Sequence, residues 1–270
     1  MMKKIVSSAW LGIVLLFMYL PIMILAVYSF MDTPTIGASG HFTLQNYVKL
    51  FTTPELTEMI LGTLSLALKC AIIATILGTM GAIGAFYSKK RMRGFVVTAN
   101  QIPIVNADVV TGFSICVLLI VVLGMDKSTL IPLLIGHVVL ATPFVYLSVV
   151  PKLKQMDNHL YEAALDLGAS PVQALRKIVI PQIAPGIIAG FFIAITLSLD
   201  DYFITTYTRP ATFNTISTYV VNATRGSQTE IKTALWALST VIFVIILLAV
   251  LIGNTMTNRK VGEKSDSNEI

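Results

Sequence analysis

The chain has 270 residues, of which 55% are hydrophobic and only 12% are charged, and its mean hydropathy is +0.80. Soluble proteins carry roughly 25% charged residues, so this composition excludes an ordinary soluble domain and predicts an all-α integral membrane protein. The formal net charge of +5 would suit a nucleic-acid binder, but the Lys and Arg residues follow the pattern that orients membrane proteins, described below.

The first expected element is a membrane span at about residues 9–30. Two lysines and a long apolar run open the chain, as they do in a signal peptide. The run is too long for a signal peptide, and no small-x-small cleavage site follows it. We therefore expect this segment to be retained as the first transmembrane helix.

Five further apolar runs are each long enough to cross roughly 30 Å of hydrocarbon at 1.5 Å per residue. The fifth is the least regular, because its second half carries polar residues. The chain is therefore expected to form six transmembrane helices in one domain, 1–258, followed by a polar, disordered tail, 259–270. The expected spans are about 9–30, 60–87, 95–124, 129–151, 182–208 and 234–256.

The distribution of Lys and Arg predicts the orientation of these spans. Thirteen of the 19 basic residues lie at the N-terminus, at 88–94, at 152–177 and in the C-terminal tail, all on one side of the predicted membrane. The richer side faces the cytoplasm, so both termini are expected inside. Lys69, within the second span, is expected to reach to the outer interface.

The stretch 152–181 is therefore expected in the cytoplasm, where it reads as two short helices around a turn. Asn158 can cap the helix HLYEAALDL, and Gly168 suits the left-handed position just past its end. The alanines at 163 and 164 make this helix thin, so that another surface can approach it closely. A solvated connector is the alternative interpretation.

The second short helix of this stretch has a strong N-terminal signature. Ser170 suits the N-cap, Pro171 the first helical position, and Gln173 completes a capping box. Pro181 and Pro185 are expected to mark the entry to the fifth span.

The same stretch carries a family resemblance. Glu162-Ala163-Ala164, then Gly168, then Ile178-Val179-Ile180-Pro181 is similar to the cytoplasmic loop signature of permease subunits in binding-protein-dependent ABC importers, with Ile180 in place of the usual Leu. The resemblance implies that this loop forms a coupling helix that docks in a groove of a separate ATPase subunit. It assigns the coupling role to Glu162, Ala163, Ala164 and Gly168.

The resemblance extends over nearly the whole chain and is greatest to the C-type permease of spermidine/putrescine importers. It implies a fold like that of the methionine-uptake permease, a bacterial inner-membrane location, a B-type permease partner, two ATPase copies and a periplasmic polyamine-binding protein. ATP and Mg would be bound by the ATPase subunits, and this chain would hold no cofactor or metal. The segments that carry the resemblance include YLPIMILAVYSF, DVVTGFSICVLL, HVVLATPFVYLSVV, RKIVIPQIAPGIIAG and TLSLDDYFITTY.

Three carboxylates fall within the predicted spans, where each costs roughly 2.5–3.5 kcal/mol on insertion scales. Counted along straight helices, Asp108 and Asp200 lie about 22 Å from the cytoplasmic boundary, in the outer half of the membrane. Asp200 and Asp201 are followed by Tyr202, so carboxylates and an aromatic face are available to a polyamine. These four residues are the predicted substrate pathway.

The alternative for these acids is helix capping or a structural ion pair. Asp200 and Asp201 are adjacent and should point about 100° apart on a helix, so that one faces the pathway while the other caps or pairs. His137 is expected at a similar depth and is interpreted as a packing or hydrogen-bonding residue. Pro103 and Pro143 are expected to kink their spans.

The sequence therefore predicts a non-catalytic permease subunit of a polyamine-type ABC importer that works by alternating access. The rivals are an ABC permease for another organic cation or amino compound, a stand-alone carrier or channel, and an intramembrane enzyme. No GxxxxGK motif, metal-ligand cluster or nucleophile–base pair is present in the sequence. The sequence does not separate spermidine from putrescine.

Overall fold

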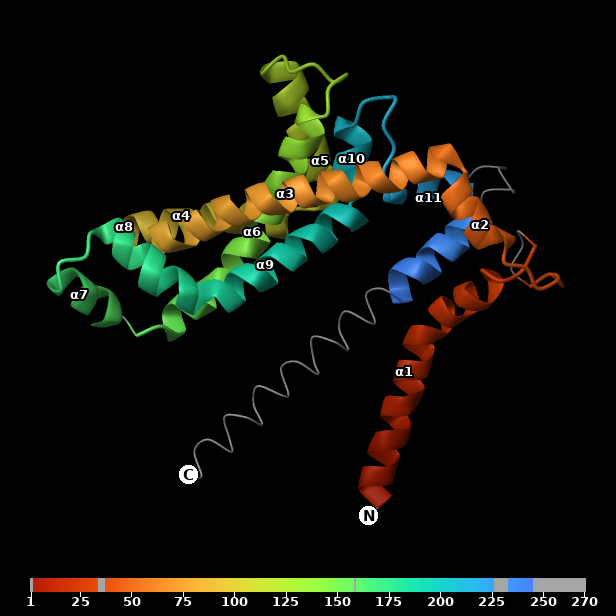
Figure 1. The fold of residues 1–270 in the computed structure, drawn as a ribbon, viewed down its shortest axis with the longest axis horizontal. Helices are drawn as coiled ribbons and strands as arrows, with labels where there is room; N and C mark the ends of the chain where they lie inside the picture. The colour runs from red at the N-terminus through yellow and green to blue at the C-terminus, as the bar shows by residue number, and fades with distance from the viewer. Residues whose placement is uncertain (1, 34–36, 158, 226–232, 245–270) are drawn as a thin grey trace. The chain divides into compact units, whose positions relative to one another are not determined.

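The computed structural model describes residues 2–33, 37–157, 159–225 and 233–244. Within these ranges the chain is helical, apart from turns and a single isolated β-bridge between Met31 and Phe42. The chain divides into two compact units, 58–221 and 1–57 with 222–270, and each unit is described by itself (Figure 1).

The unit 1–57 with 222–270 is built on α1 (Met2–Tyr28). A helix at Thr233–Val244 packs against α1 through aromatic pairs, with ring centroids 6.5 Å apart for Tyr19 and Phe243 and 5.9 Å apart for Tyr28 and Trp236. The short helix α2 (Gln45–Thr52) follows α1. The tail 259–270 and most of the predicted sixth span lie outside the described residues.

The unit 58–221 contains the remaining helices. It holds three long helices, one bent pair of helices, several short helices and the polar loop that the sequence predicts in the cytoplasm. In chain order these elements are α3 (Pro54–Tyr87), α4 (Lys90–Val105), α5 (Asp108–Cys116), the π-helical η1 (Val117–Val122), α6 (Ile131–Gln155), α7 (His159–Asp166), α8 (Pro171–Ala174), the π-helical η2 (Leu175–Val179), α9 (Ile180–Asp200), α10 (Phe203–Thr208) and α11 (Ile216–Arg225). α3 begins and α11 ends a few residues beyond the unit.

Glycines allow α3 and α9 to pack so closely on α6 that there is no space for a side chain at the contact. A Cβ atom added to Gly78 of α3 would lie 2.7 Å from the Cβ of Val145, and one added to Gly190 of α9 would lie 3.1 Å from the Cα of Val145. At Gly186 the added atom would lie 2.8 Å from the carbonyl oxygen of Ser148. Helices in lipid associate through such close packing, because there is no water to drive apolar side chains together.

The packing at Gly186 gives a direct test. We expect Gly186→Leu to force α9 away from α6 and to lower stability by about 1–3 kcal/mol, as overpacking does. Gly84→Leu is the matched control, because an added Cβ at Gly84 of α3 meets nothing within 4 Å. Thermal melting of both purified variants in lipid nanodiscs measures the difference, and equal melting temperatures would contradict the packing described here.

Four helices of the described chain are long and apolar enough to cross a membrane, or five if one bent pair is counted as a span. The four are Trp10–Tyr28, Pro54–Tyr87, Ile131–Gln155 and Pro171–Asp200. The helix Thr233–Val244 is a shorter apolar helix at the start of the predicted sixth span. The structure therefore supports a helical, multi-pass membrane protein.

The bent pair corrects the expectation of one continuous third span at 95–124. α4 and α5 meet at an angle of 107°, and the backbone at Asn106 and Ala107 is extended. Pro103 in the last turn of α4 lacks a backbone N–H, which weakens the end of that helix. The distance of Asp108 from the cytoplasmic boundary was calculated for a straight helix. Because the helix bends before Asp108, that calculated distance does not hold.

The fifth predicted span, 182–208, is not one continuous helix, because the helix that contains most of it ends at Asp200. The helix starts earlier, at Pro171, and runs without a break to Asp200, so Pro181 and Pro185 lie inside it. The wider π turn of η2 precedes Pro181, and within it the N–H of Ile180 donates to the carbonyl of Leu175. At the other end, the backbone leaves the helix at Asp201, with φ −64° and ψ 124°.

Candidate substrate pathway and coupling loop

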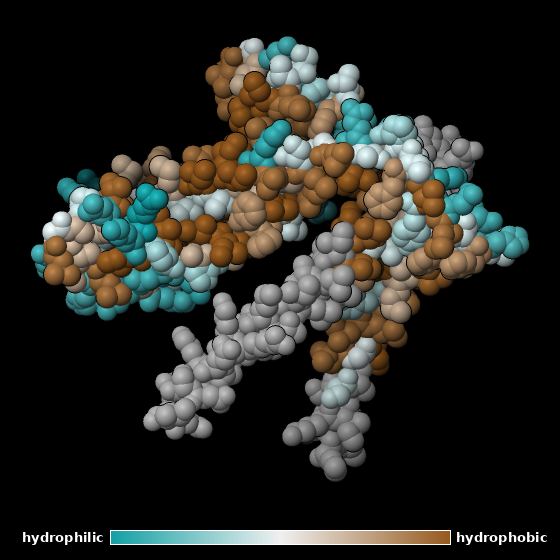
Figure 2. All heavy atoms as spheres, in the orientation of Figure 1, coloured by the Kyte–Doolittle hydropathy of each residue, from teal (hydrophilic) through white to brown (hydrophobic). Residues whose placement is uncertain are grey.

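The two predicted functional regions lie at opposite ends of α9. In Figure 1, α7 and α8 lie at the start of this helix and α10 follows its end. The ring of Tyr161 in α7 contacts that of Tyr87 at the end of α3, with centroids 5.0 Å apart. Hydrophilic residues gather around α7 and α8, whereas hydrophobic residues cover the middle of α3 and α9 (Figure 2). This distribution fits a polar loop at one membrane surface.

The turn after α7 is a Schellman motif built on Gly168, which has φ +86°. The N–H of Gly168 donates to the carbonyl of Leu165 at 2.9 Å, and the N–H of Ala169 donates to that of Ala164 at 3.0 Å. This pattern satisfies the last carbonyls of a helix and favours glycine at the left-handed position. The predicted conformation of Gly168 is confirmed.

The predicted capping box of the second helix is also confirmed. The N–H of Gln173 donates to the hydroxyl of Ser170 at 3.3 Å. The N–H of Ser170 donates to the side-chain oxygen of Gln173 at 3.0 Å. The predicted cap at Asn158 lies outside the described residues, and the carboxylate of Asp157 accepts the N–H of His159 at the start of α7.

The coupling residues named from the sequence differ in exposure. Glu162, Ala163 and Gly168 are exposed, whereas Ala164 is buried within this chain. Of the two alanines expected to let another surface approach this helix closely, only Ala163 is therefore exposed. Sequence reasoning missed Leu167, whose side chain is 89% exposed directly before the glycine turn. A leucine within a polar loop was the signal that could have identified it.

Another apolar residue is exposed on the same loop. Val172 at the start of α8 is 72% exposed, and it lies five residues after Leu167. Large apolar side chains exposed this fully on a polar loop mark an interaction surface. The turn therefore presents apolar side chains in a rigid local frame set by the Schellman motif and the capping box.

The predicted pathway acids occupy three different environments. Asp200 is the last residue of α9 and is exposed, whereas Asp201 is buried and Tyr202 is half-buried. Asp108 is exposed at the first position of α5, where a carboxylate interacts favourably with the helix dipole. The expectation that Asp200 and Asp201 share one helix is wrong, because the helix ends between them.

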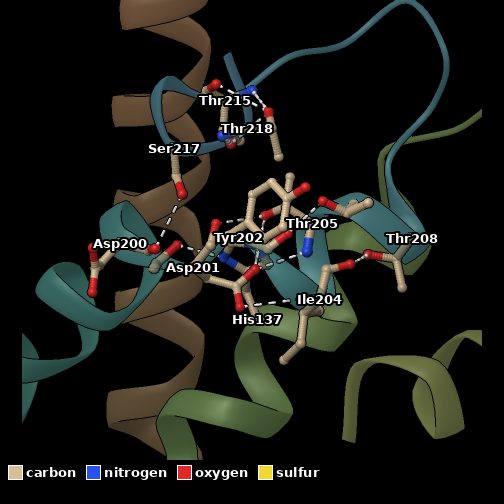
Figure 3. Close-up of polar contacts among 12 residues, drawn as sticks. His137, Asp200, Asp201, Tyr202, Ile204, Thr205, Thr208, Thr215, Ser217 and Thr218 are labelled. Carbon is tan, nitrogen blue, oxygen red and sulfur yellow. Dashed lines mark hydrogen bonds and ion pairs between the residues drawn. The ribbon is translucent and has the colours of Figure 1, made fainter. Parts of the chain in front are cut away.

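Asp201 caps α10. One carboxylate oxygen accepts the N–H of Ile204 at 3.3 Å, and the other accepts the N–H of Thr205 at 2.7 Å and its hydroxyl at 2.8 Å (Figure 3). These bonds satisfy donors that the first turn of a helix otherwise leaves unpaired. In the same view the side chain of Asp200 points away from this cluster. Asp201 therefore has the capping role and Asp200 remains accessible.

His137 of α6 connects this cap to α9. Its Nε2 lies 2.9 Å from the hydroxyl oxygen of Thr205, and its Nδ1 lies 2.7 Å from that of Ser198. Since the Thr205 hydroxyl donates to Asp201, a neutral ring with its proton on Nε2 satisfies the chain, and Nδ1 accepts from Ser198. The imidazole is completely buried, in agreement with its interpretation as a hydrogen-bonding residue.

Sequence reasoning did not connect His137 with Asp201. Nε2 lies 3.5 Å from a carboxylate oxygen of Asp201, although His137 lies in α6 and Asp201 lies far along the chain, between α9 and α10. Their similar predicted depth was the only available signal. The chain of Ser198, His137, Thr205 and Asp201 joins α6, α9 and α10.

Glycines also fit α10 between α5 and α6. A Cβ atom added to Gly112 would lie 3.2 Å from the Cα of Ile204, and one added to Gly136 would lie 2.6 Å from its Cγ2. The thiol of Cys116 donates to the carbonyl of Tyr207 at 3.3 Å. The bent pair of α4 and α5 is thus packed, through α5, against α10, the short helix that follows α9.

The adjacent acids provide a matched pair of variants. We expect Asp201→Asn to lower the stability by about 1–3 kcal/mol, because its amide cannot accept all the bonds that the carboxylate accepts. Asp200→Asn removes the same charge from an exposed position and should change the stability by no more than about 0.5 kcal/mol. Thermal unfolding in nanodiscs distinguishes them, and a larger loss for Asp200→Asn would contradict the assignment of the cap.

Long apolar helices, a rigid polar loop at one end and broken helices at the other define a membrane-embedded transport subunit. The family model for the binding-protein-dependent transport system inner membrane component matches residues 74–263. The chain belongs to this family of ABC importer permease subunits. It is a non-catalytic subunit of a multi-pass inner-membrane transporter, and separate ATPase and substrate-binding proteins are its partners.

The curated relatives are similar over most of their length. The putrescine transport system permease protein PotI of Escherichia coli is 31% identical over 84% of this chain and 85% of its own. The spermidine/putrescine transport system permease protein PotC of Haemophilus influenzae is 28% identical over 96% of this chain and 99% of its own.

Solved ABC transporters share the fold. A chain of the bacterial alginate ABC transporter, in complex with an alginate pentasaccharide-bound periplasmic protein, has a TM-score of 0.67 at 18% identity, covering 91% of this chain and 92% of its own. An amino acid ABC transporter, solved with histidines, has a TM-score of 0.56 at 15% identity, covering 81% of this chain and all of its own. Family membership disfavours the stand-alone carrier and the intramembrane enzyme.

Proposed function

We propose that this chain is the C-type permease subunit of a polyamine importer and moves spermidine or putrescine across the membrane by alternating access. The observation that carries the proposal is the continuous helix Pro171–Asp200. It begins at the capped turn of the polar loop and ends at an exposed carboxylate. A displacement of the loop would therefore be passed along one rigid element to the acidic end.

The chemistry of the acidic end suits a polycation. Asp200 and Asp108 are exposed carboxylates on two packed, broken helices, and Tyr202 offers a half-buried aromatic ring. Ammonium groups separated by methylenes bind to carboxylates and to aromatic faces. In this proposal Asp200, Asp108 and Tyr202 contact the substrate, and Asp201 positions α10. The names of the curated relatives support polyamines over another cation.

The polar loop is the proposed contact with the ATPase. Glu162, Ala163, Leu167 and Gly168 are exposed around one turn, and the apolar side chain of Leu167 fits a groove on a partner. The ATPase would act as a dimer that binds ATP and Mg, and this chain would pair with a B-type permease. A periplasmic polyamine-binding protein would deliver the substrate at the opposite surface.

The proposed topology has six spans in a fold like that of the methionine-uptake permease, with both termini in the cytoplasm. Four or five spans in the described chain, the apolar helix Thr233–Val244 and the excess of Lys and Arg on one side support it. The polar loop then lies inside and Asp200 lies towards the outer surface.

Neutralising the exposed acids tests the substrate. In the assembled importer, we expect Asp108→Asn and Asp200→Asn each to raise the KM for spermidine about tenfold, because a charged hydrogen bond of roughly 1.5–3 kcal/mol is lost. Asp126→Asn is the control. Hydrogen bonds from Ser128 lower the pKa of Asp126, so the control variant removes a charge from an exposed carboxylate outside the proposed pathway. Labelled spermidine uptake measures the effect, and unchanged uptake in both variants would exclude the proposed pathway.

Replacing Leu167 tests the coupling surface. We expect Leu167→Asp to abolish uptake and to weaken copurification of the ATPase, because a carboxylate would have to be buried in an apolar groove. Leu167→Met keeps the apolar volume and should retain both activities. Since Leu167 is 89% exposed in this chain, neither variant should change the thermal stability of the isolated permease. Full uptake with Leu167→Asp would place the ATPase contact elsewhere.

A further inference from the structure

The short helix α2 is held against the end of α1 by a buried asparagine. The side-chain amide of Asn46 donates to the carbonyls of Ser29 at 2.9 Å and Met31 at 2.8 Å. The N–H of Thr43 donates to the carbonyl of Phe30 at 2.8 Å. Asn46 and Leu50 are buried and lie one turn apart, so they form the face of α2 that packs on its own chain.

A second face of α2 is apolar and exposed. Leu44, Val48 and Phe51 are 57%, 56% and 68% exposed. Spacings of four and three residues place them in one stripe along a helix. Four large apolar side chains are thus exposed within ten residues when Phe42, which is 75% exposed, is included. These four residues are called the apolar stripe below.

A third face of α2 is polar. Gln45, Lys49 and Thr52 are exposed, and the same helical spacing places them together beside the apolar stripe. A helix with an exposed apolar face next to a polar, basic face lies in the plane of a membrane surface when such a surface is available. α2 is the next helix in the chain after Trp10–Tyr28, a helix that can span the membrane.

The aromatic residues at this junction favour lipid as the occupant. Phe30 and Phe42 are stacked, with ring centroids 5.8 Å apart and planes within 4°, and Tyr47 lies 5.0 Å from Phe30. Tyr28 pairs with Trp236 at the same end of α1. Aromatic side chains of membrane proteins are enriched at the level of the lipid headgroups. There the ring can contact acyl chains while its polar group contacts water.

We propose that α2 is an interfacial membrane helix, with its apolar stripe at the boundary between lipid headgroups and acyl chains. Gln45, Lys49 and Thr52 then face the headgroups and water, and Lys49 complements anionic lipid. Large apolar side chains of α1, among them Met23 and Val27, are also exposed, and the same bilayer would cover them. This role anchors the outer end of the first span, and it does not depend on the identity of the transported molecule.

Site-specific labelling of the assembled transporter tests the proposal. Single cysteines replace Val48, Phe51, Lys49 or Thr52 in a background in which the two native cysteines, Cys70 and Cys116, are changed to Ala and Ser. Each is labelled with an environment-sensitive fluorophore in nanodiscs of phosphatidylethanolamine and phosphatidylglycerol. We expect Val48→Cys and Phe51→Cys to be quenched several-fold more by doxyl-labelled lipid, and Lys49→Cys and Thr52→Cys several-fold more by aqueous iodide.

Two results would overturn the interfacial assignment. Equal iodide quenching at Val48→Cys and Lys49→Cys would place the apolar stripe in water. Protection of Val48→Cys from both quenchers would show that a protein surface covers the stripe. Copurification of the ATPase with each labelled variant confirms that the transporter is assembled, so either result is informative whatever the substrate is.

Discussion

Every backbone donor and acceptor that is buried in a membrane protein must find a partner within the protein, and this constraint shapes the region around α10. The helix α9 stops at Asp200, which would leave the first N–H groups of the next helix unpaired. The carboxylate of Asp201 accepts the N–H groups of Ile204 and Thr205. Burying a polar group is costly unless it is hydrogen-bonded, and the three hydrogen bonds that this carboxylate accepts from α10 offset that cost.

The hydrogen bonds of His137 extend this cap across three helices. Ser198 belongs to α9, Thr205 to α10 and His137 to α6. The break in the fifth span is therefore fixed by hydrogen bonds that join α6, α9 and α10. It leaves Asp200 exposed beside a fixed half-helix, which is the arrangement that discontinuous helices provide at substrate sites in transporters.

The helix from Pro171 to Asp200 links this hydrogen-bonded end to the polar turn after α7. Its N-terminus is defined by the box of Ser170 and Gln173, and the turn before it is defined by Gly168. Close glycine contacts with α6 at Gly186 and Gly190 hold the helix along its length. Such packing favours movement of the unit as a body, because interdigitated backbones cannot slide independently.

The sequence by itself determined the membrane character of the chain, the conformation of the turn between α7 and α8, and the family. Gly168, Ser170 and Gln173 were predictable because their bonds join residues within about five positions, so the chain needs no other element to form them. Hydropathy likewise depends only on composition along the chain. The resemblance carried by Glu162-Ala163-Ala164 and Gly168 agrees with the family model that matches residues 74–263.

Only the tertiary structure decided which aspartate caps α10, which alanine faces outward and where the third and fifth spans break. Asp200 and Asp201 are chemically identical neighbours. The capping bonds of Asp201 to Ile204 and Thr205 are local, but its buried position beside His137 of α6 is not. The exposure of Ala163 and Leu167 and the burial of Ala164 depend on how α7 packs. Burial of this kind depends on contacts between residues distant in the chain, which no local pattern records.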